Sequence, residues 1–347
     1  MDVVSGMANS RLITIGFVLM AMLSGCSTYV GPVSDHYNGD TFFNAEADNG
    51  FLDHVKWLWS MNTTDWPEWI ADAQQPAPVK VVHGDNSLRV TYVNHATVLI
   101  QAAELNILTD PIWSDRAGPL SLFGARRIRA PGVRFEQLPR IDVVLISHDH
   151  YDHLDLPTLQ HLVTRDHPVI LTGLGVKSRL ASIRSSTVHE LDWWQQYALP
   201  EGNTKITFVP TRHGSGRSLF DTNKTLWGGY SIQLPAGNVL FMGDTAFGEC
   251  VREIADRFSG FRLAILPIGN YEPRWFMKTQ HMNPDDAVRT QNAVRATHGM
   301  GIHFATFEEH PEQTVDAHEK DLAIALKTHG LEKERFWVPA FGEARDF

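Results

Sequence analysis

Three histidines and two aspartates lie within the six positions from His148 to His153. They follow residues 141–146, whose short, β-branched and apolar character predicts a buried strand. Imidazole nitrogens and carboxylate oxygens are ligands that Zn²⁺ and similar ions use. His148 and His150 alternate and can share one direction, whereas Asp152 comes after a turn. The pattern predicts a metal site at the end of this strand; a solvated polar loop is the alternative interpretation.

Three other apolar, strand-like segments each end in one further candidate ligand. Taken singly, a histidine in such a place is more typical of a core or a surface than of a metal site. Taken with the histidine run, the set supplies the roughly seven to eight protein contacts that two adjacent ions need. The candidate ligands are His148, His150, Asp152, His153, His213, Asp244 and His303.

The order of these ligands resembles that of the metallo-β-lactamase superfamily. Residues 91–100, 108–111 and 271–277 further resemble the branch that hydrolyses N-acylphosphatidylethanolamine as a phospholipase D. The last segment, with the sequence YEPRWFM, is more specific than the metal motif. The resemblance extends from about residue 36 to about residue 307. It implies an α/β fold of the αββα type, a four-layer sandwich with two metal ions at one edge of its two sheets.

The same resemblance implies a role for each candidate ligand. It assigns one divalent ion, with zinc as the expected metal, to His148, His150 and His213. It assigns the second ion to Asp152, His153 and His303, with Asp244 as the bridge. Two such ions activate water and polarise a phosphoryl or carbonyl oxygen. The prediction is a dinuclear metallohydrolase, a phosphodiesterase of phospholipase D type acting on N-acylphosphatidylethanolamine or a related lipid.

Residues outside the ligand set also have implied roles. Asp110 is expected to orient a ligand histidine, although an aspartate before a proline is equally typical of a turn. His281, with Asp244, is predicted to be catalytic and to bind substrate by donating a hydrogen bond or proton; a polar residue at a helix start is the alternative. Tyr151 is predicted to bind substrate, or to be a packed loop aromatic.

One departure from the branch concerns the substrate. Gly214 stands where the phospholipase relatives tend to carry tryptophan, which changes a pocket wall and leaves the metal ligands in place. Hydrolysis of a smaller ester or lactone is therefore an alternative function. A non-catalytic metal-binding envelope protein is a third interpretation, against which the complete ligand set counts.

The N-terminus carries the pattern of an exported lipoprotein. Residues 12–23 are almost entirely apolar, follow Arg11 and lead through small residues to Cys26. The run is shorter than the roughly 20 apolar residues that span a bilayer. We expect a signal peptide at residues 1–25, a membrane anchor at lipidated Cys26, a tether at residues 26–41 and the hydrolase domain at residues 42–347. Ser27 favours the outer membrane of a bacterial envelope; a plain cleaved signal or an uncleaved anchor is the alternative.

Composition limits the classes of partner. The chain has 43% hydrophobic residues and a net charge of −10, which argues against a nucleic-acid partner. Arg126, Arg127 and Arg129 form a local basic cluster that can meet a phosphate, or is a solvated face. Apart from Cys26 the chain has only Cys250, so no disulfide is expected inside the domain. The tryptophan-rich residues 42–78 are typical of a packed cap, or of a lid or membrane-facing surface.

Hydrophobic periodicity predicts the elements that position these residues. The expected strands are residues 80–82, 88–93, 98–101, 143–147, 169–172, 205–209, 230–234, 239–242 and 263–267. The expected helices are residues 156–164, 284–296 and 314–329. Early strands, a helix, further strands and late helices fit a sandwich of four layers.

Overall fold

The computed structural model describes residues 29–46, 49–60, 66–73, 76–84, 86–119, 123–183, 187–200, 204–218, 220–309 and 312–347. The expected signal peptide and Cys26 lie outside these residues. Within the described ranges, no helix is both long enough and apolar enough to cross a membrane.

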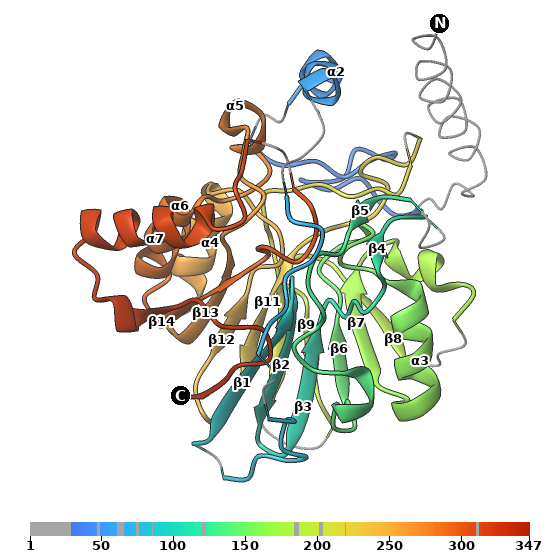
Figure 1. Ribbon diagram of the computed structural model, residues 1–347. Coiled ribbons are helices and arrows are strands. Elements are labelled where there is room, and N and C mark those ends of the chain that lie inside the picture. The colour runs from blue at the N-terminus through green and yellow to red at the C-terminus, as the bar shows by residue number, and fades with distance from the viewer. Residues whose placement is uncertain are drawn as a thin grey trace, which may run out of the picture.

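Two mixed sheets, each of seven strands, form the centre of the molecule (Figure 1). The first contains, in spatial order, β16 (Ala344–Asp346), β1 (Leu88–Asn94), β2 (Thr97–Ala102), β3 (Leu105–Thr109), β6 (Val143–Leu145), β7 (Val169–Gly173) and β8 (Val188–Leu191). The second contains β15 (Phe336–Trp337), β14 (Ala296–Ile302), β13 (Phe261–Pro267), β12 (Val239–Phe241), β11 (Gly229–Gln233), β10 (Lys205–Val209) and β9 (Gln196–Ala198). A small ribbon, β4 (Arg116–Ala117) with β5 (Ala125–Arg126), lies outside both sheets.

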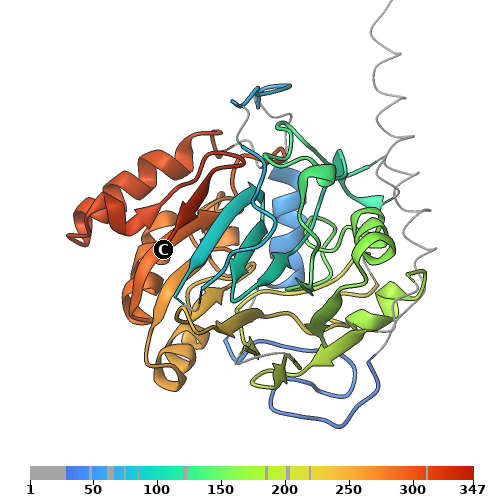
Figure 2. The same cartoon turned by 90° about the horizontal axis from the view of Figure 1, so that it is seen from below.

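Helices cover the outer faces of the two sheets (Figures 1 and 2). The first sheet is covered by α3 (Leu156–Asp166). The second is covered by α4 (Glu249–Arg257), α6 (Pro284–Ala293) and α7 (Ala317–Thr328). Two further helices, α2 (Phe51–Ser60) and the short α5 (Arg274–Met277), stand above one end of the sandwich. The predicted αββα sandwich is confirmed.

Both faces of the sheets are buried, which explains why their strands are apolar without strict alternation. In β2, Val98 and Ile100 belong to the large core between the sheets. Leu99, on the opposite face, belongs to a second core together with Leu159 and Leu162 of α3. Successive strand residues thus pack into two different cores.

Several predicted boundaries differ from the structure. Residues 80–82 are not a strand, because side chains hold this stretch in place of a ladder: Asn106 Nδ2 donates to the carbonyl oxygen of Lys80 over 3.0 Å. The helix expected at residues 284–296 ends at Ala293, since Arg295 adopts a left-handed φ of 55° and β14 begins at the next residue. The helix expected at residues 314–329 begins at Ala317. The sequence interpretation missed α4.

The described part of the expected tether, residues 29–41, is packed on the domain. Tyr37 is 3% exposed and forms a bridge with Phe42. The ring of His36 stacks on Trp193 with 4.4 Å between centroids, and its Nε2 lies 2.8 Å from Asp192 Oδ1. Residues 36 and 37 therefore belong to the folded domain and do not act as a free tether.

Candidate metal centre

Ends of strands from both sheets bring the predicted ligands together. The first sheet contributes the loop after β6, which carries the histidine run. The second contributes the segments that follow β10, β12 and β14, which carry His213, Asp244 and His303. These side chains lie close enough together to bind the same metal ions, although His150 and Asp152 are partly exposed to solvent. The convergence expected from the sequence is present in the structure.

The first group consists of three ring nitrogens. His148 Nε2 lies 2.8 Å from His150 Nδ1, which lies 3.2 Å from His213 Nε2. His213 Nδ1 lies 3.0 Å from the carbonyl oxygen of Gln280, which only accepts, so the proton of this imidazole is on Nδ1. Its Nε2 therefore presents a lone pair to the group. Burial lowers the pKa of His213 to about 3, which keeps the ring neutral as a metal ligand requires.

The second group consists of a carboxylate and two imidazoles. Asp152 Oδ2 lies 3.4 Å from His153 Nε2 and 3.5 Å from His303 Nε2. His153 Nδ1 donates to Asp110 Oδ2 over 2.8 Å, which leaves its Nε2 facing the group. Asp110 thus occupies the orienting position that was expected of it.

Asp244 lies between the two groups. Its Oδ2 is 3.1 Å from His153 Nε2 and 3.2 Å from His303 Nε2 in the second group. The same oxygen is 3.6 Å from His213 Nε2 and 4.0 Å from His148 Nε2 in the first. This is the placement that a bridging carboxylate needs.

The protonation of the second group fits a cation. Burial opposes the charge of Asp244, but the imidazoles of His153 and His303 outweigh it and hold the pKa of this carboxyl well below its usual range. Burial also opposes the charge of His303 and so lowers its pKa, but the Asp244 carboxylate outweighs burial and raises this pKa to about 10. The carboxylates therefore stabilise positive charge in this buried site. A divalent ion would supply that charge.

Unpaired polar atoms support the same fit. Within the described residues, His153 Nε2, His303 Nε2 and Asp244 Oδ1 are buried without a hydrogen-bond partner. Buried polar atoms of this kind are rare because leaving them unpaired costs about 1–3 kcal/mol each. Coordination to divalent ions would satisfy all three atoms at once.

His281 lies at the edge of the centre. It is 6% exposed, and its Nδ1 is 3.9 Å from Asp244 Oδ2. Burial holds its pKa well below the usual range, so the ring is neutral. Asn283, not His281, caps α6, since the Asn283 side chain accepts a hydrogen bond from the Asp286 amide. The helix-start interpretation of His281 therefore does not account for its position.

Tyr151 is half-buried in the loop that carries the histidine run. The guanidinium of Arg217 lies over its ring, 3.8 Å from the centroid. Arg217 Nη1 also donates to the carbonyl oxygens of Asp149 and Leu154, 2.9 Å away in each case. Arg217 thus holds Tyr151 and clamps the loop that carries the first ligands.

The basic cluster does not present free charges to a phosphate. Arg126 pairs with Glu308, and Arg129 pairs with Asp72. Arg127 is 4% exposed and donates to neighbouring carbonyl oxygens, including that of Ser114. These contacts give the cluster a structural role.

His95 was not among the predicted site residues. Its Nε2 lies 2.9 Å from Asp152 Oδ2, and its ring is 3.9 Å from that of His303, centroid to centroid. The signal that could have found it is its place in the tight turn between two predicted strands, at the edge that carries the ligands.

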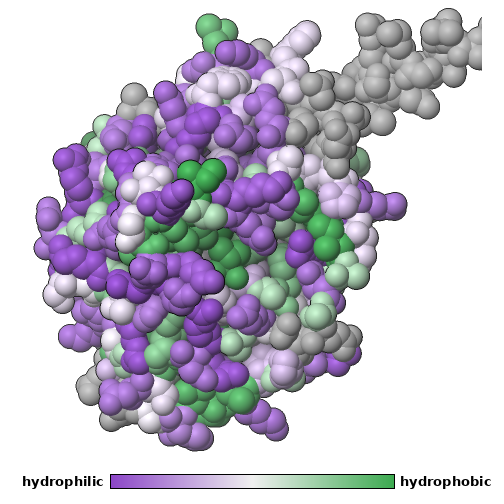
Figure 3. All heavy atoms as spheres, turned by 60° about the vertical axis from the view of Figure 1, so that its left-hand side comes forward, coloured by the Kyte–Doolittle hydropathy of each residue, from purple (hydrophilic) through white to green (hydrophobic). Residues whose placement is uncertain are grey.

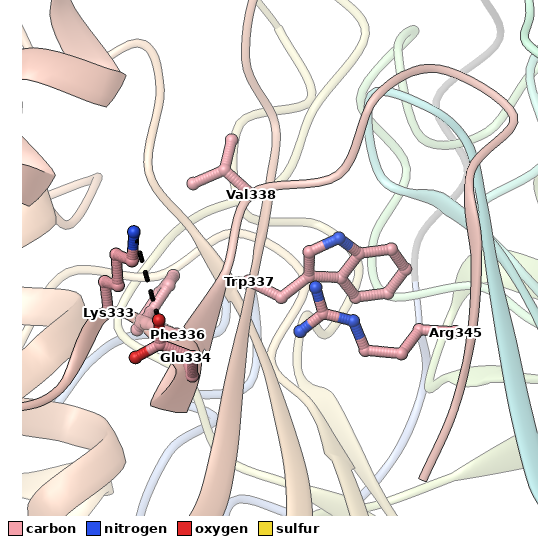
Figure 4. A pocket seen from close by; sticks show the side chains of 6 residues that line it. All are labelled: Lys333, Glu334, Phe336, Trp337, Val338 and Arg345. Atoms are coloured by element: carbon pink, nitrogen blue, oxygen red, sulfur yellow. Dashed lines mark ion pairs between the residues drawn. The ribbon is translucent and has the colours of Figure 1, made fainter.

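A surface groove lies elsewhere, where β15 at the edge of the second sheet comes near β16 at the edge of the first (Figure 4). It is lined by Lys333, Glu334, Phe336, Trp337, Val338 and Arg345. None of these is a predicted site residue, so the groove is separate from the metal centre.

Comparison with known proteins agrees with this geometry. Residues 105–304 match the family model described as a beta-lactamase superfamily domain. The N-acyl-phosphatidylethanolamine-hydrolyzing phospholipase D 1 of Caenorhabditis elegans is 38% identical over 235 residues, 65% of this chain and 66% of that protein. The mitochondrial N-acyl-phosphatidylethanolamine-hydrolyzing phospholipase D of Saccharomyces cerevisiae is 35% identical over 248 residues, 70% of this chain and 52% of that protein. The match thus spans a little under two thirds of the nematode relative and about half of the yeast one.

Solved structures show the same fold. A metallo-β-lactamase fold protein from Bacillus subtilis superposes with a TM-score of 0.54 at 17% sequence identity, over 75% of this chain and 100% of that chain. Identity at this level shows the architecture alone, so the substrate has to be argued from the site.

Proposed function

The chain belongs to the metallo-β-lactamase superfamily, and from this membership and its buried histidine–aspartate centre we propose that it is a dinuclear phosphodiesterase of phospholipase D type. The proposed substrate is N-acylphosphatidylethanolamine or a related lipid. The observation that carries the two-ion centre is Asp244, whose Oδ2 lies between the two groups of imidazoles. The lipid class is supported by the similarity to the nematode and yeast phospholipases.

Different residues would have different roles in such a reaction. The first ion would be held by His148, His150 and His213, the second by Asp152, His153 and His303, and Asp244 would join them. When bound, divalent ions supply Lewis-acid activation of water and of a phosphoryl oxygen. The neutral imidazole of His281, whose Nδ1 lies 3.9 Å from Asp244 Oδ2, would donate a hydrogen bond to a phosphoryl oxygen. Tyr151, held by Arg217, would contact the rest of the substrate.

The overall reaction balances as a hydrolysis. The oxygen of water forms a bond to phosphorus, and the bond from phosphorus to the N-acylethanolamine oxygen breaks. One proton of the water passes to the leaving alkoxide, and the other leaves with solvent. The products are phosphatidic acid and an N-acylethanolamine.

The helices α2 and α5, which stand above one end of the sandwich, support the proposal of a lipid substrate. On α2, Leu52 is 79% exposed and Trp59 is 83% exposed. Trp57 stacks on Phe276 of α5 with 5.2 Å between ring centroids, and α5 leads within a few residues to His281. Exposed leucine and tryptophan on a surface helix are typical of segments that rest on a membrane. Elsewhere, on the face shown in Figure 3, apolar residues gather in patches among hydrophilic ones.

The location of the protein is part of the proposal. The apolar residues 12–23, followed by small residues and Cys26, are the support for a lipid anchor in a bacterial outer membrane. Replacing Cys26 by alanine should release the protein or block its processing. Cys250→Ala, a change at a buried position of the domain, is the matched control and should stay on the membrane. Unchanged lipid labelling of Cys26→Ala would contradict the anchor.

The products of hydrolysis test the function. We expect the metal-loaded protein to release phosphatidic acid from N-acylphosphatidylethanolamine in mixed vesicles. The control is Asp244→Asn, which keeps the shape of the side chain and removes its charge. Release of fatty acid without phosphatidic acid, or activity confined to small esters and lactones, would overturn the phosphodiesterase assignment.

A further inference from the structure

The turn between β1 and β2 of the first sheet is hydrogen-bonded to the segment that follows β14 of the second sheet. His95 occupies this turn with a left-handed φ of 47°. Its backbone amide donates to Thr306 Oγ1 over 2.9 Å, and its carbonyl oxygen accepts from the His303 amide over 2.8 Å. His95 is therefore fixed to the strand end that carries His303, a residue of the second group.

The side chain of His95 points into the same group. It is 4% exposed, and its Nε2 lies 2.9 Å from Asp152 Oδ2. A carboxylate must be ionised to bind a cation, so in the proposed centre the oxygens of Asp152 can only accept hydrogen bonds. His95 Nε2 must then carry the proton and donate it in the hydrogen bond. In that tautomer the nitrogen has no lone pair for a metal ion.

Asp152 has a particular need for such a partner. Its side chain is 27% exposed, whereas those of His153 and His303 are 0% and 2% exposed. His153 is already oriented by Asp110 at its far nitrogen. A partly exposed carboxylate is held less firmly by packing, so a hydrogen bond from a rigid neighbour fixes its direction.

We propose that His95 is a positioning residue, which holds Asp152 at the second ion by a hydrogen bond and ties the loop of the first sheet to His303 in the second. The inference rests on the two-ion centre proposed above. The proposal predicts that His95 affects the binding of the second ion selectively, because none of its three hydrogen bonds, to Thr306, His303 and Asp152, involves a residue of the first group.

The test is a titration of the metal-depleted full chain with Co²⁺, which reports ion binding by its visible spectrum independently of activity. His95→Ala should weaken the second ion by roughly 10–100-fold and leave the first unchanged. His95→Gln should restore much of the loss, because a glutamine amide can donate from a similar position. The matched control is His318→Ala, which removes a buried histidine stacked on Phe304 at 4.3 Å. It should lower the melting temperature and leave both ions bound.

Two results would overturn the inference. One is wild-type affinity for both ions in a folded His95→Ala protein. The other is a His95→Gln protein as defective as His95→Ala, which would point to packing in place of hydrogen bonding. If the wild-type chain itself takes up only one Co²⁺ ion, the dinuclear centre fails and the role of His95 fails with it.

Discussion

His153 and Asp110 form a fully buried pair: His153 Nδ1 donates to Asp110 Oδ2 over 2.8 Å, and both side chains are 0% exposed. Ser147 completes the site around the carboxylate, since its amide and its hydroxyl donate to Asp110 over 2.7 and 2.6 Å. The consequence is a fixed tautomer, with the lone pair of His153 Nε2 directed at Asp244 and the second group.

Replacing Asp110 by asparagine should therefore weaken metal binding without removing a ligand. The amide keeps the volume of the side chain but loses the negative charge that fixes the His153 tautomer, so we expect a loss of about 10–100-fold in affinity for the second ion. Competition with a chelator measures it. Asp166→Asn is the control, because this buried aspartate accepts from the Ile141 amide away from the site. Equal affinities in the two variants would contradict the orienting role.

Asp244→Ala should affect both ions, unlike the change at Asp110. The Asp244 carboxylate is within 3.2 Å of two imidazoles of the second group and 3.6 Å from His213 of the first. Its loss leaves the two ions facing each other with less compensating charge, so metal content and turnover should both fall. Elemental analysis of the purified variant checks this. Full metal content and normal turnover would show that Asp244 is not a bridge.

His281→Ala should separate catalysis from metal binding. A hydrogen-bond or proton donor beside a reacting phosphate contributes typically about 10²–10⁴-fold, so turnover should drop by that order while both ions stay bound. Asn283→Ala is the matched control: it removes the cap of α6 at a cost of about 0.5–2 kcal/mol in stability. That variant should melt earlier and keep its turnover. Near-normal turnover of the His281 variant with two ions bound would reject its catalytic role.

The stability of the protein should depend on pH through His36. Burial lowers the pKa of this imidazole, but its hydrogen bonds with Asp192 and Asp35 outweigh burial and raise the pKa above its ordinary value of 6.5. The folded chain therefore binds this proton more tightly than the unfolded chain. The resulting stabilisation is complete below the unfolded pKa and is lost as the pH rises through the folded pKa.

Urea denaturation from about pH 6 to about pH 8 tests this linkage. The free energy of unfolding of the wild type should fall over this range by more than that of His36→Gln, because glutamine has no proton to lose. Parallel curves for the two proteins would show that His36 does not contribute to the pH dependence.

Those parts of the site that depend on local sequence patterns could be predicted from the sequence. The run from His148 to His153 is local and follows a recognisable strand. His213, Asp244 and His303 each end an apolar segment, and strand ends meet at a common edge, so their convergence could be expected as well. The αββα fold followed from the family resemblance and from the order of strands and helices.

Contacts between distant segments could not be predicted in the same way. His95 lies 57 positions before Asp152, and its hydrogen bond arises only when β1, β2 and β6 are assembled in the first sheet. The ion pair of Arg126 with Glu308 spans 182 positions, which is why a basic cluster in the sequence became a set of paired side chains in the fold. Residues 80–82 have the composition of a strand, but the Asn106 side chain donates to the carbonyl oxygen of Lys80 where a neighbouring strand would have formed a ladder.

The central claim is that two ions act together on a phosphodiester, and a metal titration of activity tests it most directly. Metal-depleted protein is supplied with increasing Zn²⁺, and the release of phosphatidic acid from N-acylphosphatidylethanolamine vesicles is followed with the bound metal per chain determined on the same samples. We predict little release at one ion per chain and full release at two. Full turnover with one ion bound, or no phosphatidic acid with two, would contradict the account.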